Sequence, residues 1–137
     1  SKEIIDEAEN ILKNAHNSVA LYMKSNKNNI IDMILSISEK VLRERFKDVS
    51  SINSLVNSVI EEYELKNNFV IRVNPLYKDN ILQEVDILKK TKKIDSEVFV
   101  LEDYNIDEGN VQIDTENGKI MLGIDSILQK VKEELVW

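Results

Sequence analysis

The chain has 137 residues, of which 42% are hydrophobic and 31% charged, and its net charge is −7. These values predict one folded domain with room for an appendage, and the acidic balance argues against nucleic acid as a partner because phosphate binding needs surplus Lys and Arg. No apolar run approaches the roughly 20 residues of a membrane span. The sequence has no cysteine, which excludes disulfides and thiolate metal sites and favours a reducing compartment. It opens at Ser1 without a methionine, so we expect a piece of a longer protein.

Residues 2–46 contain neither Gly nor Pro and carry apolar residues at helical spacing. Steps of four, three and four residues repeat every 11 residues, which is about 3.67 residues per turn, so the apolar stripe runs nearly straight along a helix. Asn26 stands in the position of this series where an apolar residue is missing. The series is Ile4, Ala8, Ile11, Ala15, Val19, Tyr22, Asn26, Ile30, Met33, Ile37 and Val41.

A continuous helix over residues 2–46 would be about 68 Å long at 1.5 Å per residue, whereas a compact domain of the remaining residues has a radius of gyration of about 12–13 Å. Such a helix overhangs its own domain, so we expect a second copy of the chain to cover its stripe. The expected dimer interface is Ile4, Ile11, Ala15, Val19, Tyr22, Ile30 and Met33. The alternative is a break in the polar run Ser25–Asn29, which would leave two antiparallel helices covering each other in a monomer.

The next stretch predicts a helix, a strand, a helix and a strand. N-cap candidates at Asp48–Ser51 precede a helix that ends near Lys66–Asn68. Phe69–Asn74 alternates as a strand and is closed by Pro75, which cannot donate to a ladder. Leu76–Lys90 has helical periodicity, and a strand is expected over residues 97–101. A strand, a helix and a strand in this order favour parallel neighbours with a right-handed crossover.

The last stretch predicts a hairpin that runs into a terminal helix. Apolar residues alternate on both sides of Asn117-Gly118, the dipeptide that best tolerates a type I′ turn. After Gly123 the spacing becomes helical, with Asp125 or Ser126 as the expected N-cap. We therefore predict an α+β protein: a long N-terminal helix over residues 1–46 as a stalk, then a domain over residues 47–137 with a mixed sheet of about four strands packed by helices.

Motifs for catalysis or cofactors are weak. Gly118-Lys119 lacks the glycine five residues earlier that a phosphate-binding P-loop needs. His16 is the only histidine and has no recognisable triad partner, so a surface role is expected. We predict no catalytic residue, no cofactor and no metal site.

Two charged groups are interpreted as solvated surface. The acidic residues before the hairpin lack the spacing of a calcium loop, and the lysines near Thr91 suit a helix C-terminus, with an acidic protein partner as the alternative. These groups are Glu102, Asp103, Asp107 and Glu108, and Lys89, Lys90, Lys92 and Lys93.

The order of these elements resembles the C-terminal part of the flagellar assembly protein FliH, a stator-like regulator of the flagellar type III export ATPase. The family is similar in turn to peripheral-stalk proteins of F-type and V-type ATPases. The likeness covers most of the chain and is most specific at Val70–Pro75, Asp107–Gly118 and Ile124–Leu128. The family often has Gly-Gly-Cys before the hairpin strand, where this chain has Glu108-Gly109-Asn110.

The resemblance implies a non-catalytic homodimer, cytoplasmic and peripherally associated with the export apparatus, whose domain binds the N-terminal region of the export ATPase. Because a tryptophan at a chain end suits an interface hot spot, we expect Val136 and Trp137 to contact that partner; the alternative is that Trp137 folds back on the sheet. Two other functions stay open: a peripheral stalk of a V-type ATPase or stator of a virulence secretion system, and a small ligand-binding α/β domain.

Overall fold

The computed structural model describes residues 1–63, 67–91 and 93–135. The chain divides into two compact units, Ser1–Ile37 and Ser38–Trp137. The predicted division at residues 46 and 47 stays a prediction. The elements are α1 (Lys2–Arg45), α2 (Ser51–Glu62), β1 (Phe69–Val73), the 3-10 turn η1 (Pro75–Tyr77), α3 (Lys78–Lys90), β2 (Val98–Glu102), β3 (Asn110–Thr115), β4 (Gly118–Gly123) and α4 (Ile124–Glu134).

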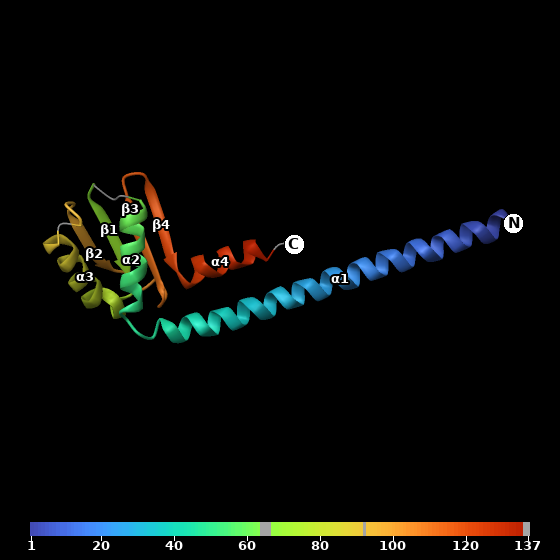
Figure 1. Ribbon diagram of the computed structural model, residues 1–137, viewed down its shortest axis with the longest axis horizontal. Helices are drawn as coiled ribbons and strands as arrows, with labels where there is room; N and C mark the ends of the chain where they lie inside the picture. Colours follow the sequence, from blue (N-terminus) through green and yellow to red (C-terminus); the bar gives the residue numbers. More distant parts are fainter. Residues whose placement is uncertain (64–66, 92, 136–137) are drawn as a thin grey trace. The chain divides into compact units, whose positions relative to one another are not determined.

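The long helix α1 is continuous from Lys2 to Arg45 (Figure 1). It passes through the polar run Ser25–Asn29 without a break, so the alternative of two antiparallel helices in one monomer is wrong. Ser and Asn cost only a few tenths of a kcal/mol each in a helix interior, whereas Gly or Pro would cost about 1 to 3 kcal/mol. None of its residues is buried in the single chain.

The four strands form one mixed sheet in the order β2-β1-β3-β4. β1 and β2 are parallel and are joined through α3, as the strand–helix–strand order predicted, whereas β3 pairs antiparallel with both β1 and β4. Buried residues alternate with half-buried ones along β1. This period of two gives the sheet one face that packs on helices and one that does not.

The core lies between that first face of the sheet and the helices α2 and α3 (Figure 1). Ile71 and Val73 of β1 and Ile113 of β3 are fully buried there. Their helical partners are the buried residues of α2 and α3: Ile52, Val56, Val59, Ile60, Ile81, Val85 and Leu88. The predicted α+β fold with a four-stranded mixed sheet is thus confirmed.

The hairpin differs from its prediction by one residue. Thr115 pairs with Gly118, so the turn residues are Glu116 and Asn117 rather than Asn117 and Gly118. The Thr115 hydroxyl accepts a hydrogen bond from the Asn117 N–H at 3.2 Å and donates to the Gly118 carbonyl at 3.0 Å, which holds the loop in this register. Gly118, the residue after the turn, has a positive φ of 132°.

The N-terminus of α4 also differs from the prediction. The helix begins at Ile124, and its cap position is Gly123, with φ of 118°, so neither Asp125 nor Ser126 is the N-cap. The side chain of Asn110 does the capping instead, because its Oδ1 accepts a hydrogen bond from the Asp125 N–H at 3.1 Å. Its Nδ2 donates to the Asp125 carboxylate at 3.1 Å. A residue from the first hairpin strand therefore provides the hydrogen-bond acceptor for a backbone N–H group at the start of α4.

Candidate interaction surfaces

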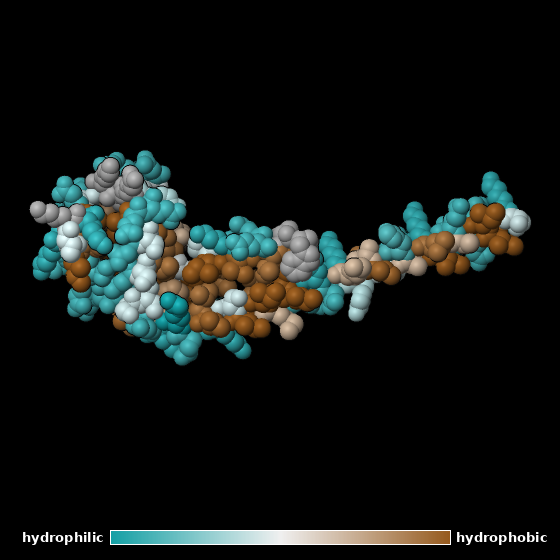
Figure 2. All heavy atoms as spheres, viewed as in Figure 1, coloured by the Kyte–Doolittle hydropathy of each residue, from teal (hydrophilic) through white to brown (hydrophobic). Residues whose placement is uncertain are grey.

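The apolar stripe of α1 is the first candidate surface. We use "the stripe" for the 11 positions Ile4, Ala8, Ile11, Ala15, Val19, Tyr22, Asn26, Ile30, Met33, Ile37 and Val41. Eight of its large apolar side chains are between 44% and 72% exposed in the single chain, and Ala15 is exposed too. Figure 2 shows apolar side chains recurring along the N-terminal part of α1. All seven residues predicted for the dimer interface lie on this stripe, and their burial against a second chain stays a prediction.

The second candidate surface is the face of the sheet opposite α2 and α3. We call it the open face and define it by two rows of residues that the strand register places side by side. The first row is Phe99, Val70, Asp114 and Lys119, and the second is Leu101, Arg72, Gln112 and Met121. Phe99 and Met121 are half exposed, at 50% and 51%, and Leu101 is 42% exposed.

The edge strand β2 is apolar on both of its faces. Val98 and Val100 pack against the core cluster, while Phe99 and Leu101 lie on the open face. A continuous apolar run is typical of strands that are covered on both sides, whereas a strand with one solvated face normally alternates with polar residues. β2 therefore has the composition of a strand whose second face is also covered.

A polar cluster lies between the apolar parts of the open face. The Arg72 guanidinium donates a hydrogen bond from Nε to the Asp114 carboxylate at 2.7 Å, and Gln112 Nε2 donates to the same carboxylate at 2.7 Å. These donors lower the pKa of Asp114 below its ordinary value, with Arg72 as the largest cause and Gln112 next. The cluster ties β1 to β3 across the face and keeps Asp114 ionised.

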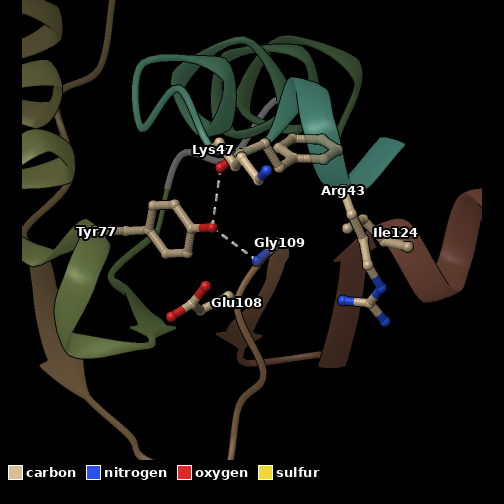
Figure 3. A pocket seen from close by; sticks show the side chains of 7 residues that line it. Arg43, Lys47, Tyr77, Glu108, Gly109 and Ile124 are labelled. Atoms are coloured by element: carbon tan, nitrogen blue, oxygen red, sulfur yellow. Dashed lines mark hydrogen bonds between the residues drawn. The ribbon is translucent and has the colours of Figure 1, made fainter. Parts of the chain in front are cut away.

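A small hollow is lined by Arg43, Phe46, Lys47, Tyr77, Glu108, Gly109 and Ile124 (Figure 3). Its volume is about 190 Å³, below the roughly 300–1,000 Å³ of typical ligand pockets. The buried Tyr77 hydroxyl accepts a hydrogen bond from the Gly109 N–H at 2.8 Å and donates to the Phe46 carbonyl at 3.3 Å. Burial raises the pKa of Tyr77. Because the Tyr77 hydroxyl makes both of these hydrogen bonds within the protein, we interpret the hollow as structural rather than as a ligand site.

The charged groups singled out in the sequence are not assembled into a centre. In the described residues, 1–63, 67–91 and 93–135, no three or more His, Asp or Glu side chains are placed to hold a metal ion. His16 is exposed on α1. Lys90 pairs with Asp86 at 2.9 Å on α3, and Lys78 pairs with Glu102 at 3.5 Å, as expected of solvated surface charges. Lys92 lies outside the described residues.

The two residues predicted to contact a partner, Val136 and Trp137, also lie outside the described residues. The terminal helix before them is amphipathic, as its spacing predicted. Ile124 is buried, and Ile127 and Leu128 pack against the core cluster.

No helix in the described stretches 1–63, 67–91 and 93–135 combines the length and hydropathy that crossing a bilayer requires.

Sequence reasoning did not identify the residues that make up the open face. Its signal was present in the run Val98–Leu101, where every residue is apolar. Alternation could not show which side chains face the core, because both sets are hydrophobic. The register with β1 decides it: Phe99 lies opposite Val70 on the half-buried side of β1, and Val98 lies opposite the buried Phe69.

Comparison with known proteins shows which family the chain is similar to. Residues 2–131 match the family model of the flagellar assembly protein FliH. The chain is similar to the probable flagellar assembly protein FliH of Bacillus subtilis (strain 168), with 22% identity over 134 residues, 98% of this chain and 64% of that protein. It is also similar to the flagellar assembly protein FliH of Borreliella burgdorferi, with 29% identity over 122 residues, 82% of this chain and 37% of that protein.

The chain thus spans about two thirds of the length of one of these relatives and just over a third of the other. The family match, in contrast, runs through α1, the whole sheet and most of α4. Because the match includes both the long helix and the α+β domain rather than one of them, the chain belongs to the FliH family of flagellar assembly proteins.

Proposed function

We propose that this chain is a non-catalytic regulatory component of the flagellar type III export machinery. In this proposal two copies pair through the stripe of α1, and the unit Ser38–Trp137 binds the N-terminal region of the export ATPase. Membership of the FliH family supports the setting. The two exposed apolar surfaces support the mode of action, which is binding rather than chemistry.

The observation that carries the ATPase proposal is the open face with its doubly apolar strand β2. Covering the exposed parts of Phe99, Leu101 and Met121 would contribute on the order of 1 kcal/mol each. An amphipathic helix suits this surface, because its apolar side can cover β2 while its polar side reaches the Arg72–Asp114 pair.

A titration with a peptide from the ATPase N-terminus tests this proposal. Calorimetry should show binding to the wild type and a loss of at least tenfold in affinity for Phe99→Ser with Leu101→Ser, because a tenfold change corresponds to about 1.4 kcal/mol. The matched control is Leu82→Ser with Ile87→Ser, which removes two exposed apolar side chains from α3 instead. The control should bind like the wild type.

Two outcomes would contradict the proposal. Absence of binding by the wild type removes the ATPase as a partner. Equal loss in the β2 and α3 variants, or in neither, removes the open face as the site. A third variant, Trp137→Ala, tests the site expected from the sequence at the chain end, and a selective loss there would move the contact to that end.

The homodimer proposal has its own test. Ile11→Asp with Val19→Asp places two charges on the stripe and should yield a folded monomer by sedimentation, whereas the wild type should sediment as a dimer. The matched control, Asn10→Asp with Asn17→Asp, adds the same charge to α1 away from the stripe and should leave the dimer intact. A wild-type monomer at high micromolar concentration would rule out the stalk.

A further inference from the structure

Asn26 occupies the middle of the stripe. An 11-residue repeat completes three turns, so residues 11 apart fall on one line along the helix. The stripe then consists of three lines about 33° apart, and the middle line is Ile4, Ala15, Asn26 and Ile37. The flanking lines are Ala8, Val19, Ile30 and Val41 on one side and Ile11, Tyr22 and Met33 on the other. Asn26 is the one amide among these 11 positions.

The stripe fits a second copy of α1 better than an unrelated surface. Its spacing is kept from Ile4 to Val41, which is about 55 Å at 1.5 Å per residue. A partner that covers it must present the same 11-residue spacing over the same length, and a second copy of this chain does so by identity. In addition, α1 runs unbroken through Asn26, so both halves of the stripe lie on one helix.

Asn26 distinguishes between the two ways in which the copies could pair. In a parallel pair in register, each Asn26 lies opposite the other, and the two carboxamides can donate to and accept from each other. In an antiparallel pair with the stripes fully overlapped, Asn26 lies near Val19 of the other copy, which offers no side-chain hydrogen bond. A buried amide without a partner is costly, and a single asparagine in a helical seam is a known determinant of register.

We propose that Asn26 selects the parallel, in-register pairing of two α1 helices by a hydrogen bond between the two Asn26 carboxamides. This inference rests on the proposed homodimer and goes beyond it, because it assigns the orientation and the register to one residue. The polar run Ser25–Asn29 then has a function at its second position, while the rest of the run lies off the stripe.

Cysteine cross-linking tests the inference directly, because the wild-type chain has no cysteine. Ala15→Cys places a small thiol on the middle line. In the parallel pair two such cysteines face each other within the 4.4–6.8 Å Cα separation that a disulfide needs, whereas in the antiparallel pair they are about 22 Å apart. Antiparallel pairing would instead join Ala15→Cys of one copy to Ile30→Cys of the other.

Mixed Ala15→Cys and Ile30→Cys chains are oxidised, and the products are separated by mass. With Asn26 present, each cysteine should join to its own counterpart, and these like-to-like products should exceed the mixed product by at least about tenfold. With Asn26→Ile the excess should fall below about threefold. The matched control, Asn28→Ile, removes an amide off the stripe and should keep the wild-type ratio.

The outcomes separate the two proposals. Reduced chains that sediment as monomers would contradict the homodimer itself. Dimers that yield mainly the mixed product would overturn the parallel register while leaving the homodimer standing. An Asn26→Ile chain with the wild-type product ratio would show that Asn26 does not select the pairing, and circular dichroism of each variant confirms that α1 is still helical.

Discussion

The two units of this molecule differ in whether their apolar side chains are buried within one chain. The unit Ser38–Trp137 has a core of buried apolar side chains, with Ile71, Val73 and Ile113 fully enclosed. The unit Ser1–Ile37 has a regular apolar pattern of its own, but none of its side chains is buried in the single chain. Pattern alone therefore does not distinguish a buried face from one that is exposed in the single chain.

The difference concerns where the stability comes from. Helices in water draw most of their stability from packing of an apolar face rather than from intrinsic propensity. For α2 and α3 that packing is internal to the chain. In the proposed homodimer the stripe of the first 37 residues packs against a second molecule, so the stability of this segment should depend on protein concentration. Thermal unfolding should accordingly show two transitions, of which one moves with concentration.

The largest expected loss of stability comes from Gly123→Ala, which should affect only the unit Ser38–Trp137. Gly123 has φ of 118°, a conformation that disfavours a side chain, and a Cβ atom there would overlap the carbonyl oxygen of Gly109. That carbonyl also accepts the hydrogen bond from the Ile124 N–H at 3.0 Å, so it cannot move without releasing α4. We expect a loss of roughly 4 kcal/mol or more, measured by chemical denaturation of the domain transition.

The control for Gly123 is Gly118→Val, a second glycine with positive φ. Apart from its own chain neighbours, no residue has an atom within 4 Å of the place where a Cβ would stand, so the Cβ adds backbone strain without a close contact. The expected cost is on the order of 1 kcal/mol. In both variants the concentration-dependent transition should be unchanged. Equal losses of stability at the two glycines would show that the close approach of Gly109 and Gly123 does not constrain the point where β4 runs into α4.

A pair of isoleucine truncations gives the next largest effect and tests the comparison directly. Ile113→Ala creates a cavity in the core and should lower the free energy of unfolding by about 3 kcal/mol at every protein concentration. Ile11→Ala removes an exposed side chain and should leave the domain transition unchanged while weakening the dimer in sedimentation. A concentration-independent loss in Ile11→Ala would mean that α1 is stabilised within one chain.

Much of the domain could be predicted because its signals are local. Alternation and the turn dipeptide placed the hairpin to within one residue, and the missed detail depended on the Thr115 hydroxyl, which no periodicity reveals. The cap of α4 was missed for a different reason. Asn110 is 15 residues from Asp125 in sequence, and only the pairing of β3 with β4 brings its side chain to the helix.

The two candidate surfaces also differ in whether their signal in the sequence is local. The stripe of α1 could be found from the sequence, since a helix fixes which residues share a line. The residues of the open face could not be found in this way, because every residue of the run Val98–Leu101 is apolar and alternation does not show which of them face the core. Its two rows exist only through the register of four strands, in which β1 pairs with β2 and β3, both far from it in the sequence.

The smallest expected effect belongs to the polar cluster of the open face and appears as a dependence on pH. Because Arg72 and Gln112 lower the pKa of Asp114 in the folded state, the folded protein holds that proton less readily than the unfolded chain. The stability from this carboxylate is therefore present above its ordinary pKa of about 3.9 and is lost as the pH falls through the lower, folded-state pKa. Asp114→Asn removes that contribution.

The variant should be somewhat less stable than the wild type at pH 7, and the two stability curves should converge below about pH 4. Denaturant titrations of the domain transition from pH 7 to pH 2.5 measure this convergence. Asp86→Asn is the control, because its ion pair with Lys90 is exposed on α3 and should be worth only a few tenths of a kcal/mol. Curves for Asp114→Asn that stay parallel to the wild type at every pH would show that the Arg72–Asp114 pair does not stabilise the sheet, and the open face would then be held by its strand pairing alone.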